Sequence, residues 1–194
     1  MARPRKFDPD EVVERSMRAF WEHGYRETSV DDLVAATSVQ PGSLYNAFRG
    51  GKRELFLQSL ERYSSLVVPE KLGALEAPGA SLAEVRAYFD ALVEDLMSED
   101  GRIGCLIVNS TVELAADDSV VAALASGHME RLERNTARAL RTAKRRGEIP
   151  KKIDPAARAK LLMATGMGLM VVGKTNPGRE VLETIVQAAF AELG

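Results

Sequence analysis

The sequence predicts an all-α protein of about nine helices. Apolar residues recur at helical spacing through nearly all of the 194 residues, and the alternation typical of β-strands never extends beyond a few positions. Glycine and proline interrupt this pattern at intervals that suit turns between helices. Because 45% of the residues are hydrophobic and 28% are charged, the composition is that of a globular protein with a substantial core.

The first two helices have recognisable ends. Residues 9–23 carry an apolar stripe, with Pro9 in a first-turn position and Gly24 at the place of a C-terminal stop. The second helix opens near Ser29, which has the spacing of a capping box with Asp32. We therefore expect a short second helix close behind the first.

The third helix differs from the others because its exposed face is slim and polar. Leu44, Ala47 and Phe48 have the spacing of a face that packs on a core. Gln40 leads the helix, and the residues expected on the opposite face are Pro41, Gly42, Ser43, Tyr45 and Asn46. Gln and Asn side chains pair with adenine, hydroxyls bond phosphates or base edges, and glycine permits close approach to a duplex. This pattern favours a helix that enters the DNA major groove.

Groups that bind phosphate surround this helix. Thr28 and Ser29 lie at a helix N-terminus, where free N–H groups bind anions, and Lys52 opens the fourth helix. A basic arm precedes the first helix and consists of Arg3, Arg5 and Lys6. Such an arm adds nonspecific or minor-groove contacts, and a net charge of −2 requires that DNA binding come from a local patch. Exposed polar residues on a short helix are usually just solvated, so the residues alone leave both interpretations open.

The remaining helices follow a change in composition. The fourth helix is predicted at residues 52–68, before a loop rich in Gly, Ala and Pro at residues 72–80. Later helices are predicted at residues 81–97, 104–115, 119–146, 155–173 and 178–193. We interpret the loop at residues 72–80 as the boundary between a small N-terminal head and the remainder of the chain.

The last two helices carry a large apolar surface. Residues 161–173 are apolar around the whole circumference of the helix, and the final helix is strongly one-sided. A buried core pair explains this pattern, and so does an interface with a second copy, which we favour because so small a protomer has little else to cover both surfaces. The residues predicted at this interface are Leu162, Gly166, Leu169, Val181, Ile185 and Ala189.

The single cysteine is the most informative residue of the second domain. Cys105 precludes an internal disulfide and lies near an expected helix start, where the helix dipole favours a thiolate. Lys174 ends an apolar helix and is placed to approach such a thiolate, while Asn109, Met163 and Met167 are further candidates for a sensor site. The alternative is that Cys105 is a small buried hydrophobe, as most lone cysteines are.

Enzymatic and membrane functions are not indicated. The sequence has no metal-ligand cluster, no phosphate-binding glycine loop and no nucleophile motif, so we expect no enzyme activity, metal or cofactor. His128 follows Gly127, and the two interpretations of it are a ligand contact and a histidine on a helix surface, of which we favour the second. The charged N-terminus lacks an apolar signal region, and residues 161–173 are shorter than the about 20 residues of a membrane span, so we expect a soluble cytoplasmic protein.

The segment from Gly24 to Leu55 resembles the N-terminal helix-turn-helix of the TetR family of bacterial transcriptional regulators. That pattern runs G-[YF]-x-x-T-[ST]-[VI], then a helix and a turn, then G-x-[LIF]-Y-x-x-F and a lysine that opens the next helix. The matching residues are Gly24, Tyr25, Thr28, Ser29, Val30, Leu33, Val39, Gly42, Leu44, Tyr45, Phe48, Lys52 and Leu55. Ser38 stands where the family usually has Gly, and the longer stretch FRGGK makes Arg49 and Arg53 alternatives to Lys52 as the phosphate contact.

The resemblance implies a one-component switch. Residues 1–51 would bind DNA, and residues 52–194 would sense a small-molecule effector and dimerise, with helix 52–68 transmitting the signal. The protein would bind an inverted-repeat operator as a homodimer, most often as a repressor. The segment GCLIVNSTVELA around Cys105 is similar to family members that answer reactive electrophiles or oxidants through a cysteine, and to members that do not. The alternatives are a DNA-binding protein without an effector and an α-helical enzyme.

Overall fold

The expected fold class is confirmed. The computed structural model describes residues 7–193 and, of these, all side chains but those of residues 99 and 100. Within this range the chain forms nine α-helices, one short 3₁₀ helix and no strand. The predicted basic arm of Arg3, Arg5 and Lys6 lies outside the described residues.

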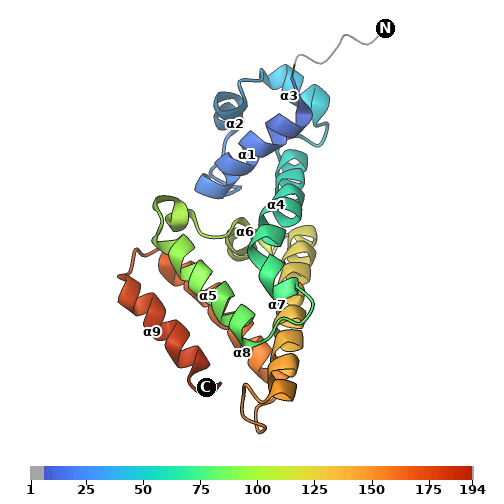
Figure 1. The fold of residues 1–194 in the computed structure, drawn as a ribbon. Coiled ribbons are helices and arrows are strands. Elements are labelled where there is room, and N and C mark those ends of the chain that lie inside the picture. The colour runs from blue at the N-terminus through green and yellow to red at the C-terminus, as the bar shows by residue number, and fades with distance from the viewer. Residues whose placement is uncertain (1–6, 194) are drawn as a thin grey trace.

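The helices form a small head on a larger body (Figure 1). Their bounds are α1 (Pro9–His23), α2 (Val30–Thr37), α3 (Pro41–Ala47), α4 (Gly51–Glu76), α5 (Leu82–Met97), η1 (Glu99–Ile103), α6 (Leu106–Leu114), α7 (Ser119–Arg146), α8 (Pro155–Gly173) and α9 (Arg179–Phe190). Helices α1 to α3 form the head at one end, and α4 runs from the head into the body beside α7. Helices α5, α6, α8 and α9 complete the body.

The head is held to α4 by an aromatic cluster. The ring centroids of Phe20 and Phe56 lie 5.2 Å apart, and those of Tyr25 and Phe56 lie 4.7 Å apart. Such pairs add about 0.5–1.5 kcal/mol each beyond the area that they bury. The predicted capping box of Ser29 and Asp32 is confirmed and starts α2 behind this cluster.

Ser38 ends α2 in the left-handed conformation, with a φ of 59°. A side chain in this conformation costs about 1–2 kcal/mol. Glycine avoids this cost, but it loses more conformational entropy on folding, so the net gain in stability is only part of the cost. We therefore expect Ser38→Gly to raise the free energy of unfolding by about 1 kcal/mol, which raises the melting temperature by about 2–4 °C. Thermal denaturation measures this shift. Ser43→Gly, within helix α3, is the matched control and should lower the melting temperature; a lower value for Ser38→Gly would contradict the strain.

Helix α4 is longer than predicted. It continues through Pro69 to Glu76, so the prediction of a loop over residues 72–80 is wrong for its first half. The Glu76 carboxylate accepts hydrogen bonds from Arg131 at 2.6 and 2.8 Å, and Arg138 donates to the Glu76 carbonyl at 2.7 Å. Residues of α7 thus supply hydrogen bonds to the C-terminal end of α4. The local sequence does not reveal these partners.

Helix α8 is the central apolar helix of the body. It spans Pro155–Gly173 and is therefore longer than the apolar stretch at residues 161–173 that we compared with a membrane span. By length and composition alone, the whole helix is apolar enough to cross a membrane. It packs against α7, α5 and α9 of the same chain, and 33% of its most apolar window is buried.

Four of the residues predicted at a dimer interface belong to the core of the protomer. Leu162 and Leu169 are fully buried, Ala189 is 9% exposed, and Gly166 faces the ring of Phe89. Their assignment to an interface is wrong, because helices of the same chain already cover them. The large apolar side chains that α8 and α9 leave exposed are Leu161, Val171 and Val181, of which Val181 was predicted at the interface.

Candidate DNA-binding helix and sensor cavity

Helix α3 presents a polar face to solvent. Leu44 is buried at its centre, and Phe48 is buried where the helix ends. The exposed residues are Gln40, Gly42, Ser43, Tyr45 and Asn46, with Pro41 half-buried. Tyr45 is 50% exposed, and no atom lies within 4 Å of the position that a Cβ would take at Gly42. The helix is thus anchored on one side and open to a large partner on the other.

Two of the residues predicted to contact phosphate, Thr28 and Ser29, make hydrogen bonds within the head. Thr28 is fully buried, and its hydroxyl donates to the Gly24 carbonyl at 2.6 Å. The Thr28 side chain therefore closes the turn before α2, and the phosphate contact expected from the N–H groups of this helix N-terminus stays a prediction. Ser29 is exposed, but its hydroxyl and N–H are both engaged with Asp32.

The long turn before Lys52 is built around Gly51. This residue has a φ of +64°, which glycine adopts without strain. A Cβ there would lie 3.2 Å from the Tyr45 ring, so glycine at this position lets α3 and α4 approach each other closely. Lys52 is the second residue of α4, and its Nζ lies 4.5 Å from the centre of the Tyr25 ring.

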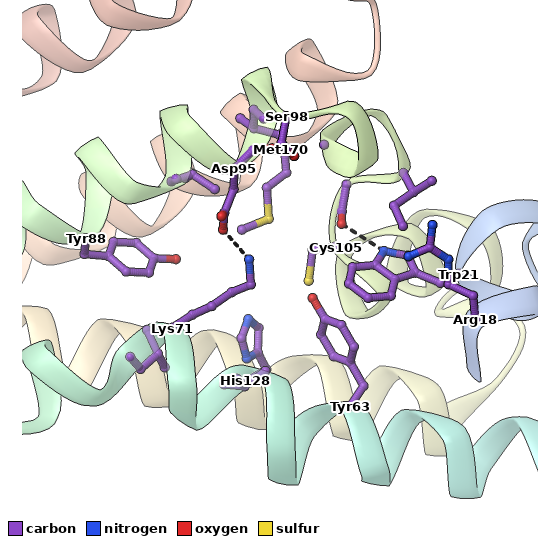
Figure 2. Close-up of a pocket in the computed structure, with 17 residues that line it drawn as sticks. Arg18, Trp21, Tyr63, Lys71, Tyr88, Asp95, Ser98, Cys105, His128 and Met170 are labelled. Atoms are coloured by element: carbon purple, nitrogen blue, oxygen red, sulfur yellow. Dashed lines mark hydrogen bonds and ion pairs between the residues drawn. The ribbon is translucent and has the colours of Figure 1, made fainter. Parts of the chain in front are cut away.

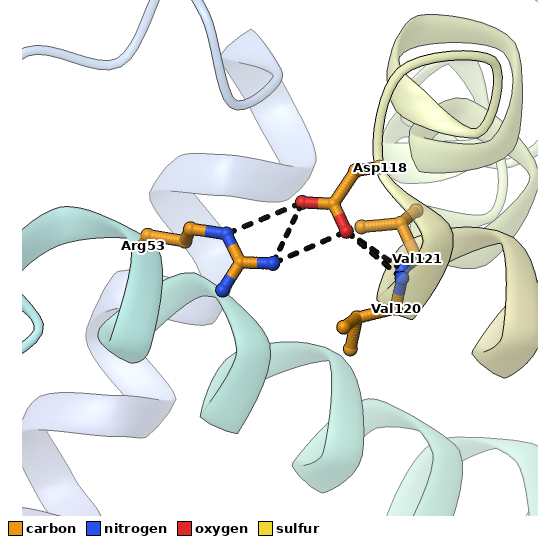
Figure 3. A network of polar contacts seen from close by, with 4 residues as sticks. All are labelled: Arg53, Asp118, Val120 and Val121. Carbon is orange, nitrogen blue, oxygen red and sulfur yellow. Dashed lines mark hydrogen bonds and ion pairs between the residues drawn. The ribbon is translucent and has the colours of Figure 1, made fainter.

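Arg53 joins the head end of α4 to α7 (Figure 3). Its guanidinium donates to both carboxylate oxygens of Asp118, with distances of 3.0 and 3.2 Å. Asp118 also accepts from the N–H groups of Val120 and Val121, which caps α7. These backbone hydrogen bonds, followed by Arg53, hold the pKa of Asp118 below its usual value. Arg53 therefore links α4 to the start of α7, and its role as an alternative phosphate contact stays a prediction.

A cavity of about 180 Å³ lies where the head meets the body. Figure 2 shows side chains from α1, α4, α5, α7 and α8 pointing into it around Cys105. The labelled polar residues are Arg18, Tyr63, Lys71, Tyr88, Asp95, Ser98, Cys105 and His128. Because α1 and α4 form part of the wall, a molecule in this cavity touches elements that position the head.

Cys105 lies at the N-terminus of helix α6 and faces the cavity. It is the N-cap residue of α6 and only 5% exposed. Figure 2 shows the Tyr63 hydroxyl pointing toward the Cys105 thiol. Burial, with the nearby thiol, raises the pKa of Tyr63 and of Tyr88, so both phenols stay protonated.

Two hydrogen-bonded contacts connect this region to the head. The Trp21 indole N–H donates to the Gly104 carbonyl at 2.8 Å, and Gly104 adopts a φ of +68° directly before Cys105. At the other end of α6, the Glu113 carboxylate accepts from the N–H groups of Tyr25 and Arg26 at 2.9 and 2.6 Å. We call these contacts of Trp21 and Glu113 the α1–α6 latch. It was not predicted, because its partners lie more than 80 positions apart in the sequence.

Comparison with known proteins accounts for both halves of this architecture. Residues 12–58 match the model of bacterial regulatory proteins of the tetR family, and residues 81–189 match the Tetracyclin repressor-like C-terminal domain. The chain belongs to the TetR family. It is therefore a TetR-type transcriptional regulator with a DNA-binding head, as the resemblance of residues 24–55 implied.

Relatives of this TetR family member match it over nearly the whole chain. It is 30% identical to the HTH-type transcriptional repressor ComR of Escherichia coli K12, over 94% of this chain and 87% of ComR. It is also 30% identical to the transcriptional repressor DhaR of Mycobacterium sp. GP1, over 94% of this chain and 90% of DhaR. A cysteine mutant of the regulator CifR, solved with a 26-bp double-stranded operator DNA, superimposes with a TM-score of 0.84 at 27% identity, over 100% of both chains.

The remaining sensor candidates of this TetR protein do not share one site with Cys105. Lys174 donates to Asn109 at 2.8 Å, and both line a neighbouring hollow beside Val112 and Val171 rather than the cavity. Burial lowers the pKa of Lys174. The predicted Met163 and Met167 pack against the core without lining the cavity, whereas Met170 does line it.

The interpretation of His128 as a surface residue is wrong. Its side chain is 8% exposed and lines the cavity from α7. Tyr63 and Tyr88 were also missed as site residues, because an aromatic residue at helical spacing has the same signature as ordinary core. Only the packing of α4, α5 and α7 brings the three together.

Proposed function

We propose that the protein is a repressor that binds an inverted-repeat operator as a homodimer and releases it when the cavity is filled or Cys105 is modified. The exposed polar face of α3 is the observation that carries this proposal. Tyr45, Asn46 and Ser43 are available to a duplex because Leu44 and Phe48 hold the opposite side.

Each exposed residue of α3 has a distinct part in the proposed contact. Gln40 and Asn46 would read base edges, and the Ser43 and Tyr45 hydroxyls would bond phosphates or bases. Pro41 and Gly42 would let the start of the helix approach the groove. Lys52, with the helix N-terminus at Thr28 and Ser29 and the basic arm of Arg3, Arg5 and Lys6, would contribute to the phosphate contacts.

Tyr45→Ala tests the DNA-binding face. We expect its operator affinity to fall by about tenfold or more, because the substitution removes an exposed aromatic hydroxyl at the duplex while the buried side of α3 is untouched. Gel shifts with the promoter regions of the protein's own gene and its neighbours measure this. Arg134→Ala, at an exposed position of α7, is the control and should bind as the wild type does. Equal affinity of the Tyr45→Ala and wild-type proteins would refute the assignment of α3.

The homodimer is proposed from the apolar surface that one protomer leaves uncovered. Leu161 and Val171 are each 50% exposed on α8, and Val181 is 47% exposed on α9. Ile185 is half-buried on α9, one turn after Val181. Only 33% of the most apolar window of α8 is buried within the protomer, so a second copy is the natural cover.

The proposed signal travels through both α4 and α6. A molecule in the cavity contacts Trp21 on α1 and Tyr63 on α4, and it lies beside Gly104. Opening the hydrogen bond between Trp21 and Gly104 would loosen the α1–α6 latch and change the spacing of the two α3 helices in the dimer. Repression then ends because the phosphate contacts depend on that geometry. Operator and effector binding that prove energetically independent would refute this coupling.

The cavity favours an effector-dependent regulator over a DNA-binding protein without an effector. An enzyme is disfavoured by membership in a family of transcriptional regulators. A regulator of this kind acts where the DNA is, so we assign the protein to the cytoplasm, without a cofactor.

A further inference from the structure

The cavity beside Cys105 is small. Its volume of about 180 Å³ is close to the about 150 Å³ of an engineered apolar cavity that holds benzene. Leu72, Leu92, Leu96 and Met170 contribute apolar walls. Size and lining therefore select a compact, mostly apolar molecule, about as large as a ring with one short substituent.

The charges around the cavity are already compensated. Among the lining side chains that the structure describes, Lys71 pairs with Asp95, and Arg18 pairs with Glu22. The phenols of Tyr63 and Tyr88 stay protonated. An ion that entered would lose its hydration without gaining a dedicated counter-charge, which is unfavourable. An uncharged ligand is therefore preferred.

One buried polar atom in this wall lacks a partner. The imidazole of His128 is more than nine-tenths buried, and its Nδ1 has no hydrogen-bond partner among the residues that the structure describes. Figure 2 shows the ring facing the space between Lys71, Tyr63 and Cys105. Burial, and then the charge of Arg131, lower the pKa of His128, so the ring is neutral at pH 7. Buried polar groups are normally hydrogen-bonded; Nδ1 is covered in this structure, and the cavity that the ring lines is the adjoining space from which a partner can come.

We infer that the effector is a small uncharged molecule with a hydroxyl or carbonyl oxygen, and that this oxygen hydrogen-bonds to Nδ1 of His128 while the apolar part lies against Leu72, Leu92 and Met170. A neutral imidazole serves either kind of oxygen, since its nitrogen can donate or accept according to the tautomer. This inference rests on the proposed function, because it assigns the chemistry of the effector. It assigns to His128 the recognition of that oxygen and leaves Cys105 free for covalent modification.

A series of matched ring compounds tests this inference on the full chain. Benzyl alcohol, toluene, benzoate and benzylamine differ little in size but differ in charge and hydrogen bonding. Calorimetric titration should show that benzyl alcohol binds the wild type, while benzoate and benzylamine bind at least tenfold more weakly. In His128→Leu, benzyl alcohol should bind about tenfold more weakly, whereas toluene should bind at least as well as before. Cys105→Ser should retain the wild-type order, because none of the four compounds alkylates a thiol.

The outcomes separate this inference from the proposed function. Tightest binding of benzoate or benzylamine, or equal affinity of wild type and His128→Leu for benzyl alcohol, would overturn the assignment. Absence of any binding to the wild type would overturn it as well, and would indicate that water alone occupies the cavity. Melting curves of His128→Leu check that it is folded. Gel shifts without any ring compound test operator binding independently, so failure there refutes the proposed function alone.

Discussion

Leu161→Glu combined with Val181→Glu should convert the protein to a monomer and lower its operator affinity by about 100-fold or more. The two side chains are 50% and 47% exposed in the protomer, so the glutamates are solvated in the monomer and the fold is retained. In the proposed dimer the same glutamates would be buried against apolar surface, which is strongly unfavourable. A monomer engages one half-site at a time and loses the gain from simultaneous binding.

Light scattering after size exclusion and gel shifts measure the two parts of this prediction. The matched control is Leu66→Glu with Val120→Glu, because these residues have similar exposed fractions of 55% and 45% on α4 and α7. It should remain dimeric and bind the operator. A wild type that is monomeric at micromolar concentration would contradict the homodimer, and a charged α8–α9 variant that stays dimeric would place the interface elsewhere.

N-ethylmaleimide should release the wild-type protein from its operator and leave Cys105→Ser bound. Alkylation converts the thiol to a bulky thioether inside a cavity of about 180 Å³, next to Gly104. The Trp21 to Gly104 hydrogen bond of 2.8 Å has little room to persist beside such a group. We expect operator affinity to fall by at least about tenfold, the equivalent of one or two lost hydrogen bonds.

Mass spectrometry on the same samples shows how much Cys105 has reacted, which matters because the residue is only 5% exposed. Full modification without operator release would show that Cys105 is a buried structural residue. Equal release of Cys105→Ser would show that the reagent acts at another group. Weaker release in Glu113→Gln, with Cys105 fully alkylated, would support a role of the α1–α6 latch in carrying the signal.

The sequence predicted the head of the molecule well because its determinants are local. The capping box of Ser29 and Asp32 and the buried position of Leu44 both depend on residues within one or two helical turns. Spacing rules describe such contacts directly. The exposed face of α3 followed from the same reasoning.

The cavity and the true end of α4 were beyond such rules. Glu76 is satisfied by Arg131, which lies 55 positions later, and Trp21 bonds Gly104, which lies 83 positions later. His128 is a half-polar residue on a long helix, and only the packing of α4 against α7 decides that it faces inward. Helical periodicity indicates that a face is buried, but it does not show which other helix covers it.

Trp21, whose indole N–H donates to the Gly104 carbonyl, is also an intrinsic fluorescence probe. The chain has one tryptophan, Trp21, which lies in the cavity wall on α1, a helix of the head. Its ring stacks edge-on to Tyr63 at 4.9 Å, beside the Cys105 thiol. Intrinsic fluorescence of the unlabelled protein therefore reports a single position, where occupancy of the cavity and movement of the head both change the surroundings of the indole. Stopped-flow recording of that emission would order the two events in time.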